Sequence, residues 1–417
     1  MIKNVCVLGL GYIGLPTSAM FASSGVKTYG VDVNQNVIDS LKKGEIIIEE
    51  SGLPELVKEV VDKGYLECGT TPIVSDVYII AVPTPVREDK TAGMEYVESA
   101  TKSILPIIKK GDLVVLESTS PPRTTEDIIV PILKNSGLDI GKDVFVSHSP
   151  ERVLPGQILN ELVNNNRIVG GINEESSLKT KELYEIFVKG DIFITDATTA
   201  EMCKLMENTY RDVNIALANE LAKISEKLKI NAFDVVKYAN MHPRVNLHTP
   251  GPGVGGHCIA VDPWFIIEKA PEVTSLMEAS RTINDGMPKY VANKALDILK
   301  DKKNVTVLGI TYKPDVDDMR ESPIVHLIEE LENEGVNVKV VDPHVSKYDI
   351  PLYENIENSD LLILAVNHKE FKDLDFIKIY EAMNSKNILD TRNYYNRESL
   401  EKIGFNYTLL GDGGHFE

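Results

Sequence analysis

The residues best suited to covalent chemistry lie in the segment Gly251-Pro-Gly-Val-Gly-Gly-His-Cys258-Ile-Ala-Val-Asp262-Pro263. The five glycines and prolines ahead of Cys258 predict a loop that leaves the thiol unshielded and turns backbone N–H groups toward a ligand. A cation beside a cysteine favours the thiolate, which is the nucleophilic form. Cysteines without a disulfide are more often inert core residues, so composition alone leaves a structural thiol open as the alternative.

A second group of polar residues recurs at helical spacing. Glu201, Lys204, Asn208 and Arg211 fall at i, i+3, i+7 and i+10, which places them along one stripe of a helix. A desolvated lysine serves as a base or stabilises an oxyanion. A solvated face with a Glu–Lys pair is the alternative interpretation. Asn208 argues against it, because asparagine has modest helix propensity and gains little on a plain surface.

A glycine-rich turn predicts a dinucleotide site. Gly9-Leu-Gly11-Tyr-Ile-Gly14 directly follows an apolar strand and opens a helix. Gly9 permits the tight turn, Gly11 lets the backbone approach a pyrophosphate and Gly14 allows close helix–strand packing, while the helix N-terminus attracts the anion. Asp32 ends the second strand, where a carboxylate accepts hydrogen bonds from a ribose diol and repels a 2′-phosphate. The pattern therefore favours NAD over NADP.

Two later strand ends extend the predicted cofactor site. They read Val82-Pro-Thr84-Pro85 and Glu117-Ser-Thr119-Ser-Pro121. Ligands of open α/β sheets bind at the carboxyl ends of the strands, which makes the hydroxyls of Thr84 and Thr119 candidate donors to the cofactor. A turn-forming role for either hydroxyl is equally compatible with the sequence.

The elements that must position these groups show two patterns, first alternating strands and helices and then one long helix. Apolar runs at 5–10, 28–33, 77–82 and 113–118 predict parallel strands separated by helices, the βαβ pattern of a doubly wound sheet. After about residue 195 one helical pattern runs over 198–229, longer than the usual ~8–20 residues. Thr198 and Glu201 have capping-box spacing at its start. We expect this helix to join two domains and to pack against a second subunit.

The opening pattern then returns in altered form. A linker rich in proline and glycine spans 242–263, more helical pattern runs to about 300, and apolar runs follow at 305–310, 339–343 and 361–366. Thr311 and Pro314 stand where Gly11 and Gly14 stand in the first copy, so the second copy should bind a different ligand. The predicted fold class is α/β, with two Rossmann-like doubly wound domains joined by a long central helix and a helical middle domain.

Composition narrows the class of protein. The 417 residues include 44 Lys+Arg and 63 Asp+Glu, a net charge of −19, which argues against binding to nucleic acid or to an anionic membrane. No apolar run reaches the ~18–20 residues of a membrane helix, and the N-terminus reads as a strand without a secretion signal. Four scattered cysteines predict neither a disulfide framework nor a metal site. We expect a cytoplasmic protein without a metal.

The motifs taken together resemble those of the UDP-glucose/GDP-mannose dehydrogenase family. They are GLGYIGLP, VPTP, STSPP, SPER (149–152), EMCKLMEN (201–208), GGHCIAVDP (255–263) and TYKPDVDDMRESP (311–323), in the family's order and over nearly the whole chain. The resemblance implies an NAD-binding Rossmann domain at 1–195, a central helical dimerisation domain at 196–300 and a UDP-sugar-binding Rossmann-like domain at 301–417. It also implies a homodimer or homotetramer.

The resemblance implies a role for each matching position. Cys258 would be the nucleophile, Lys204 the acid/base residue and Asn208 a stabiliser of the oxyanion, with Asp262 and Glu151 as supporting carboxylates. The cofactor-contacting positions, besides Gly9, Gly11 and Gly14, are Tyr12, Ile13, Asp32, Thr84, Thr119 and Arg320. The substrate-contacting positions are Arg152, Lys204, Asn208, Arg211, His242, Arg244, Gly255, Tyr312, Lys313 and Arg392.

The implied reaction oxidises the C6 alcohol of UDP-N-acetyl-D-mannosamine to a carboxylate, using two NAD⁺ and a thiohemiacetal and thioester on Cys258. Val153-Leu154-Pro155 replaces a second acidic residue found in relatives that act on UDP-glucose, which argues against that substrate. The configuration at C2 stays open, so UDP-N-acetylglucosamine or another UDP-sugar is an alternative. More distant alternatives are a β-hydroxyacid dehydrogenase that releases one NADH, and a non-catalytic NAD-binding protein.

Overall fold

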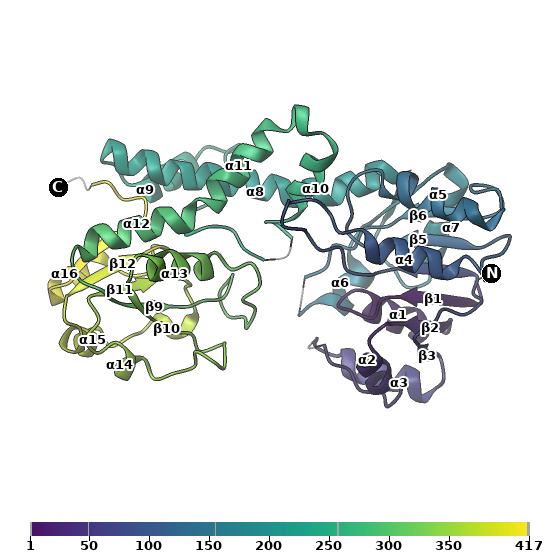
Figure 1. Cartoon of the computed structure of the whole chain (residues 1–417), viewed down its shortest axis with the longest axis horizontal. Coiled ribbons are helices and arrows are strands. Elements are labelled where there is room, and N and C mark those ends of the chain that lie inside the picture. The colour runs from purple at the N-terminus through teal and green to yellow at the C-terminus, as the bar shows by residue number, and fades with distance from the viewer. Residues whose placement is uncertain (1, 49, 155, 257, 415–417) are drawn as a thin grey trace. The chain divides into compact units, whose positions relative to one another are not determined.

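The computed structural model describes residues 2–48, 50–154, 156–256 and 258–414. Two compact units make up the chain, one of Met1–Glu207 with Trp264–Pro271 and the other of Asn208–Pro263 with Glu272–Glu417. Each carries one of the two sheets drawn in Figure 1. His257 and Pro155, which belong to motifs singled out in the sequence, lie outside the described residues.

The first unit is built on an eight-stranded sheet of order β3-β2-β1-β4-β5-β6-β7-β8. All its described pairings are parallel except that of β6 with β7. The strands are β1 (Asn4–Leu8), β2 (Lys27–Val31), β3 (Leu66–Gly69), β4 (Val77–Ile80), β5 (Leu113–Leu116), β6 (Phe145–His148), β7 (Arg167–Gly171) and β8 (Ile192–Asp196). The four predicted strands are confirmed, each ending two residues earlier than expected.

Helices flank this sheet on the connections between its strands. They are α1 (Gly14–Ser23), α2 (Gln35–Leu41), α3 (Leu53–Asp62), α4 (Glu95–Ile104), α5 (Val130–Leu133), α6 (Ile158–Asn164) and α7 (Glu174–Tyr184). Every residue of β4 and β5 is buried, as expected for central parallel strands covered on both faces. The side chains of Val5, Val115 and Phe21 join the core beneath α1 and α7.

Helix α8 (Ala197–Leu228) follows as the predicted long helix, and Figure 1 shows it running on into the second unit's part of the chain. The predicted capping box is wrong. Asp196 caps the helix instead, because its carboxylate accepts the N–H of Thr199 at 2.8 Å and the Thr199 hydroxyl at 2.6 Å. Glu201 reaches away from the helix start to another segment of the first unit.

Four more helices belong to the middle of the chain: α9 (Ala232–Ala239), α10 (Asp262–Lys269), α11 (Ser275–Asp285) and α12 (Met287–Leu299). Buried polar groups join α11 to the second half of α8. Arg281 donates to Asp212 at 2.5 Å, and Asn284 donates to the same carboxylate at 2.8 Å. The side-chain amide of Asn219 donates to Asn284 at 2.9 Å. Each of these buried side chains therefore has a polar partner, although among the described residues one oxygen of Asp212 and the Nε of Arg281 have none.

The second unit contains a five-stranded parallel sheet of order β10-β9-β11-β12-β13. Its strands are β9 (Asn304–Leu308), β10 (Asn337–Val341), β11 (Leu361–Leu364), β12 (Asn387–Asp390) and β13 (Asn406–Leu409), with helices α13 (Pro323–Asn333), α14 (Leu352–Asn355), α15 (Phe376–Ala382) and α16 (Arg397–Ile403). This order repeats β2-β1-β4-β5-β6 of the first sheet. The predicted class, two Rossmann-like domains with a helical middle region, is therefore confirmed.

None of the helices formed by the described residues has both the length and the apolar character needed to cross a membrane.

Candidate active site

The turn after β1 has the geometry that a dinucleotide needs. Gly9 has a φ of 97°, and a Cβ there would lie 2.4 Å from the carbonyl oxygen of Ala81. A Cβ on Gly14 would lie 1.9 Å from the carbonyl oxygen of Gly9, so only glycine lets α1 start this close to the strand. Above Gly11 there is nothing within 4 Å, which leaves its backbone open to an approaching pyrophosphate.

Asp32 follows β2 and is partly exposed. One carboxylate oxygen accepts the N–H of Leu10 at 3.0 Å and the other accepts the N–H of Asn34 at 2.8 Å. These bonds hold the carboxylate against the glycine turn, at the position where Rossmann domains bind a ribose diol. Tyr12 is exposed and Ile13 is half-buried on the same turn.

The two threonines after β4 and β5 contact each other. The hydroxyl of Thr84 donates to the carbonyl oxygen of Thr119 at 2.6 Å. The Thr84 proton therefore joins two neighbouring loops, which is the turn-forming role that the sequence left open. Both side chains are half-buried, and the Thr84 hydroxyl oxygen keeps its capacity to accept a hydrogen bond.

Glu151 belongs to a buried charge network that the sequence did not reveal. It forms a short ion pair with the buried guanidinium of Arg167, which also faces the buried carboxylate of Glu117 at 3.4 Å. Tyr184 donates to Glu117 at 2.5 Å. Burial raises the pKa of Glu117 to about 7, although the charge of Arg167 acts in the opposite direction. Glu151 is thereby fixed in place from the interior side.

Arg152 is held beside it on the surface. Its guanidinium pairs with Glu207 at 2.7 Å and donates to the carbonyl oxygen of Asn166. A substrate anion that uses Arg152 must therefore share it with Glu207 or displace that carboxylate.

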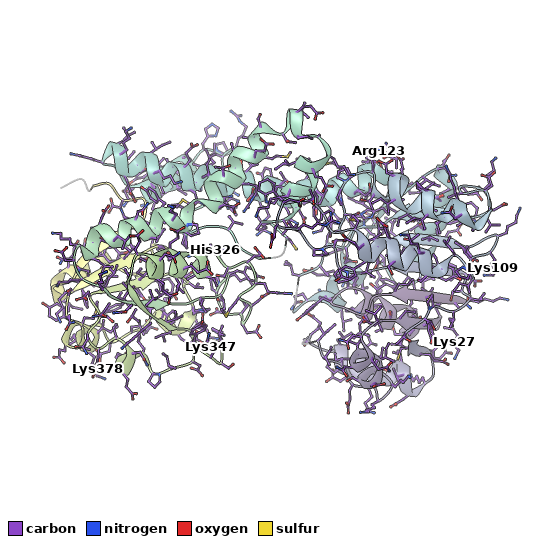
Figure 2. All side chains as sticks on the ribbon, viewed as in Figure 1. Lys27, Lys109, Arg123, His326, Lys347 and Lys378 are labelled. Carbon is purple, nitrogen blue, oxygen red and sulfur yellow. The ribbon has the colours of Figure 1, made fainter. Side chains whose placement is uncertain are left out.

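The four residues of the predicted stripe on α8 have different environments. Glu201 is buried and accepts the N–H groups of Arg123 and Thr125 at 2.6 and 2.8 Å; Arg123 is labelled in Figure 2. Burial raises the pKa of Glu201 to about 7. Lys204 is half-buried and forms no ion pair with any described residue, so the interpretation as a Glu–Lys surface pair is wrong.

Further along α8, Asn208 is buried and donates to the carboxylate of Asp262 at 2.6 Å. Asp262 is also buried and opens α10. The structure thus joins two residues that lie 54 positions apart and that the sequence analysis assigns to one site. Arg211 is exposed.

The thiol of Cys258 is exposed, which excludes the alternative of a buried structural cysteine. Its carbonyl oxygen accepts the N–H groups of Val261 and Asp262 at 3.1 and 2.9 Å, so the residue sits in the turn that leads into α10. The preceding loop packs on the loop after β9. A Cβ on Gly255 would lie 2.4 Å from the carbonyl oxygen of Glu321, and one on Gly256 would lie 2.9 Å from the ring of Tyr312.

Tyr312 lies close enough to this thiol for their charges to interact. Burial raises the pKa of Tyr312, and the negative charges of Asp318 and Cys258 raise it further. The predicted nucleophile and a predicted substrate-binding residue therefore share one part of the second unit. Lys313, next in the chain, is exposed.

Arg392 borders the start of the same loop. A Cβ on Gly251 would lie 2.8 Å from an Nη atom of Arg392, and the Nε–H of Arg392 donates to the carbonyl oxygen of Ala365 at 3.0 Å. Burial lowers the pKa of Arg392 to about 10. Asn219 accepts the N–H of Gly251 at 2.9 Å, so this loop is anchored to α8 by a residue that sequence analysis missed.

The remaining predicted residues lie at the surface. His242 and Arg244 are exposed, and the imidazole Nδ1 of His242 accepts the N–H of Arg244 at 3.3 Å. Arg320 is exposed and makes a two-pronged contact with Asp318, at 2.9 Å from Nε and 2.7 Å from Nη2. None of these three residues is enclosed within the unit that carries it.

Comparison with known proteins finds one family along most of the chain. Residues 3–188 match the NAD binding domain of the UDP-glucose/GDP-mannose dehydrogenase family, residues 198–286 its central domain and residues 306–397 its UDP binding domain. The chain is 47% identical to a UDP-N-acetyl-D-mannosamine dehydrogenase of Methanococcus aeolicus over 425 residues, covering 99% of this chain and 96% of the relative.

Solved structures agree over the whole length. A UDP-N-acetyl-mannosamine dehydrogenase from S. aureus matches with a TM-score of 0.89 and 48% identity, over 98% of this chain and 99% of that one. A UDP-D-ManNAc dehydrogenase from Pyrococcus horikoshii matches with a TM-score of 0.90 and 40% identity, over 99% and 100%.

The glycine turn with Asp32, the exposed thiol and these matches define an NAD-dependent nucleotide-sugar dehydrogenase. The chain belongs to the UDP-glucose/GDP-mannose dehydrogenase family.

Proposed function

We propose that this enzyme oxidises the C6 alcohol of UDP-N-acetyl-D-mannosamine to the carboxylate of UDP-N-acetyl-D-mannosaminuronate, with two NAD⁺ reduced. The substrate is that named for the relatives that match over the full length. The observation that carries the four-electron reaction is the exposure of Cys258 on a glycine loop packed against Tyr312. An alcohol dehydrogenase that stops at the aldehyde has no use for such a thiol.

The residues of the first domain fit the cofactor. Gly9, Gly11 and Gly14 leave room for a pyrophosphate at the start of α1, and Asp32 is placed to accept hydrogen bonds from a ribose. Tyr12, Ile13, Thr84, Thr119 and Arg320 are the further proposed contacts. Bound NAD⁺ supplies the hydride acceptor for each of the two oxidations.

Lys204 and Cys258 divide the chemistry between them in this proposal. Lys204, directly or through a water, takes the proton of the C6 hydroxyl as the alcohol becomes an aldehyde. The Cys258 sulfur then adds to the aldehyde carbon, forming a thiohemiacetal that stays bound. Loss of the second pair of electrons gives a thioester, and water cleaves its C–S bond to release the carboxylate and restore the thiol. Glu151 is the proposed carboxylate for handling that water.

Asn208 and Asp262 act together in the oxyanion step. The Asn208 amide donates one N–H to Asp262, and an amide group carries two such donors. We assign the second donor to the oxygen that becomes negative when sulfur adds to the aldehyde. Asp262 fixes the orientation of that amide. Lys204 lies four residues before Asn208 on the same helix, and so faces the same side of it.

The diphosphate of the substrate requires cations on a protein of net charge −19. Arg392 is the strongest candidate, because its charge is partly desolvated and among the described residues it forms no ion pair. The other proposed contacts to the UDP part of the substrate are Gly255 and two residues of the loop after β9, Tyr312 and Lys313. Arg152, Arg211, His242 and Arg244 are the further proposed sugar and phosphate contacts.

We further propose the domain division 1–195, 196–300 and 301–417, and a homodimer or homotetramer in the cytoplasm. The exposed side chains of Tyr210, Leu217, Ile224 and Leu228 on α8 support self-association. They remain 62%, 50%, 46% and 63% exposed and recur at intervals of seven, seven and four residues, which places them along one side of the helix. Apolar surface of this extent favours a protein partner.

The proposed function is tested by counting NADH released per sugar. The purified protein is incubated with NAD⁺ and limiting amounts of UDP-N-acetyl-D-mannosamine, UDP-N-acetylglucosamine or UDP-glucose. We expect two NADH per UDP-N-acetyl-D-mannosamine and little turnover of UDP-glucose. One NADH per sugar would instead support a two-electron dehydrogenase, and faster turnover of UDP-N-acetylglucosamine would reassign the substrate.

Cys258→Ser tests the covalent step, with Cys68→Ser as the matched thiol control. Cys68 is a half-buried residue of β3 in the first sheet. We expect Cys258→Ser to stop turnover at or before the aldehyde, so that no second NADH appears, whereas Cys68→Ser keeps the full yield. A Cys258→Ser variant that still gave two NADH per sugar at the normal rate would eliminate the thioester.

A further inference from the structure

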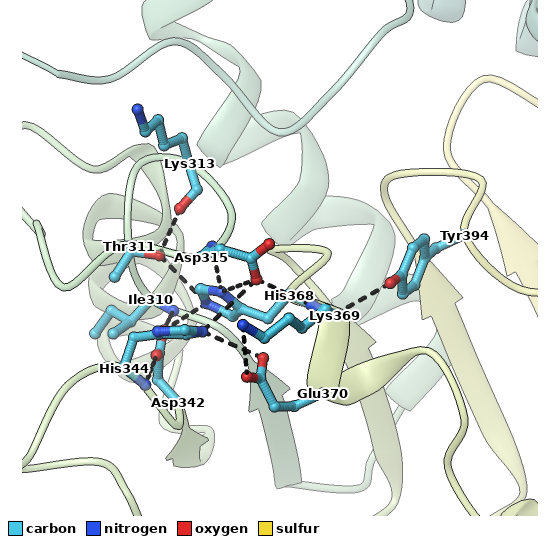
Figure 3. Close-up of polar contacts among 10 residues, drawn as sticks. All are labelled: Ile310, Thr311, Lys313, Asp315, Asp342, His344, His368, Lys369, Glu370 and Tyr394. Atoms are coloured by element: carbon cyan, nitrogen blue, oxygen red, sulfur yellow. Dashed lines mark hydrogen bonds and ion pairs between the residues drawn. The ribbon is translucent and has the colours of Figure 1, made fainter. Parts of the chain in front are cut away.

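A cluster of histidine and carboxylate side chains lies at the carboxyl ends of three adjacent strands in the second domain (Figure 3). Asp315 follows β9, His344 follows β10, and His368 and Glu370 follow β11. One ligand atom from each of the four residues lies within 4.8 Å of the others. The sequence did not predict this cluster because its members are separated by up to 55 positions and share no local spacing.

The distances from His344 to the two exposed carboxylates are close to those expected between neighbouring ligands of a metal ion. The Nε2 of His344 lies 3.2 Å from a carboxylate oxygen of Glu370 and 3.7 Å from one of Asp315. Bonds from a divalent transition metal to nitrogen and oxygen are about 2.0–2.2 Å, so neighbouring ligand atoms at tetrahedral angles are about 3.3–3.6 Å apart. The three side chains also reach solvent, His344 least of them with 21% of its side chain exposed, which gives an ion a path of entry.

Buried groups hold this set of ligands in place. The imidazole Nδ1 of His368 accepts the N–H of Asp315 at 2.9 Å, and its Nε2 donates to the buried Asp342 at 3.0 Å. Asp342 also accepts the N–H of His344 at 2.9 Å, and the Asp315 carboxylate accepts the N–H of Lys369 at 3.1 Å. Asp315 and His344 are thereby positioned by a second layer of hydrogen bonds, as in protein metal sites.

The charges around the three ligands favour a cation. The carboxylates of Asp315 and Glu370 face the ring of His344, and the carboxylate of Asp342 lies behind it. On the described residues packed against the cluster, the ammonium of Lys369 is the nearby positive group, 3.8 Å from Glu370. Lys369 is 72% exposed, so its pair with Glu370 is a weak surface pair. An ion that enters replaces this pair and the contact between His344 Nε2 and Glu370.

We propose that a divalent cation of the zinc class binds to His344 Nε2 and to the carboxylates of Asp315 and Glu370, with solvent completing its coordination. His368 is a positioning residue, because its Nδ1 is already used by the N–H of Asp315. An imidazole with two carboxylates suits Zn²⁺ and similar ions. The ion would tie the loop that carries Tyr312, Lys313 and Asp315 to the ends of β10 and β11.

The test measures metal binding directly, so it does not depend on the proposed reaction. Chelator-treated full-length protein with Cys258→Ser, which removes the exposed thiol as a competing ligand, is titrated with Zn²⁺ by calorimetry and with Co²⁺ by visible absorption. We expect one equivalent of either ion, and visible Co²⁺ bands with a nitrogen ligand. His344→Ala and the isosteric Glu370→Gln should each weaken binding at least ten-fold.

His326→Ala is the matched control. His326, labelled in Figure 2 on α13, pairs with Glu329 at 3.2 Å and its side chain is 62% exposed. This variant should bind the same single equivalent as the Cys258→Ser protein. The proposal is wrong if no Zn²⁺ binds, or if His344→Ala and Glu370→Gln bind it as tightly as the control. Circular dichroism of each variant separates loss of a ligand from loss of the fold.

Discussion

Gly9 and Gly309 follow the first strand of their respective sheets, and Asp32 and Asp342 follow the second. The two glycines have φ values of 97° and 85°. The aspartates make the same backbone contacts, since Asp342 accepts the N–H groups of Ile310 and His344 as Asp32 accepts those of Leu10 and Asn34. The two domains therefore form their first strand–turn units in the same way.

The two domains differ in the surroundings of the aspartate that follows the second strand. Asp32 is partly exposed, whereas Asp342 is fully buried and paired with the imidazole of His368. Helix α1 begins at Gly14, but α13 begins only at Pro323, so the second domain has a long loop in place of a helix N-terminus. The comparison identifies two features of a dinucleotide site that the second domain lacks, a helix that starts at the glycine turn and an accessible carboxylate after the second strand.

The largest difference between the domains should appear in stability. Asp342→Ala leaves the buried N–H of Ile310, the part-buried N–H of His344 and the buried imidazole of His368 without their acceptor. We therefore expect a loss of about 3 kcal/mol in the free energy of unfolding. Asp32→Ala, at the matched exposed position, should cost about 1 kcal/mol. Chemical denaturation of both variants measures the two values. Equal losses would contradict this prediction and show that the two carboxylates contribute equally to stability.

The two domains should also respond in opposite ways to pH. The pKa of Glu117 in the first domain is raised to about 7 by burial, so the folded state holds a proton between about 4.5 and 7 and stability falls as the pH rises through that window. Burial alone would raise the pKa of Asp342, but the hydrogen bonds from His368, Ile310 and His344 lower it. Its contribution is present above its ordinary pKa and is lost as the pH falls below about 4.

Glu117→Gln tests this contrast. The variant should lose the part of this fall that belongs to Glu117, which amounts to up to about 3 kcal/mol between pH 4.5 and 7 because one pKa unit is about 1.4 kcal/mol. The part that belongs to Glu201, whose pKa burial also raises to about 7, should remain. Glu98→Gln, at a surface pair on α4, is the control and should keep the wild-type profile. Denaturation midpoints across pH 4–8 supply the measurement, and identical slopes in both variants would contradict the assignment to Glu117.

Cofactor choice should depend on the first aspartate alone. Asp32→Ala removes both the acceptor for a ribose diol and the repulsion of a 2′-phosphate, so we expect at least a ten-fold rise in the KM for NAD⁺ and measurable use of NADP⁺. Lys27→Ala, at an exposed residue of β2 labelled in Figure 2, should leave both cofactors unaffected. Unchanged discrimination in Asp32→Ala would contradict the ribose role.

The smallest effect on stability is expected at Gly11. A Cβ there meets nothing within 4 Å, so Gly11→Ala should change the free energy of unfolding by less than about 0.5 kcal/mol while weakening NAD⁺ binding several-fold. Thr311, its counterpart, is buried and its hydroxyl donates to the carbonyl oxygen of Lys313 at 2.9 Å. Isothermal titration with NAD⁺ distinguishes the ligand effect from a folding effect.

Sequence patterns within short segments predicted the features that depend mainly on neighbouring residues. The apolar runs of β1, β4 and β5 identify buried parallel strands because both faces of such strands are covered. The Gly9–Gly14 turn and Asp32 lie within one βαβ unit, where their spacing alone predicts the place of a cofactor site. The exposure of Cys258 followed in the same way from the small residues that precede it.

What the sequence did not reveal depends on contacts between distant segments. Glu117 follows β5 and Arg167 begins β7, and Asn219 contacts Gly251 across 32 positions. The capping-box prediction failed because Asp196, one residue before the helix, was available to accept the N–H of Thr199, and Glu201 has partners on another segment. Spacing rules contain no information on such pairings, which are determined by tertiary packing.

Helix α8 and helix α11 are joined by Asp212, Arg281, Asn219 and Asn284, all buried, and the last link in this chain of contacts is the N–H of Gly251. If one helix slid or turned against the other, a guanidinium and a carboxylate would be stranded in an apolar interior, at a cost of several kcal/mol. Only one helical register is therefore tolerated. Gly251 starts the segment that leads to Cys258 and is bonded to Asn219, so the packing of the two helices also determines where this segment begins.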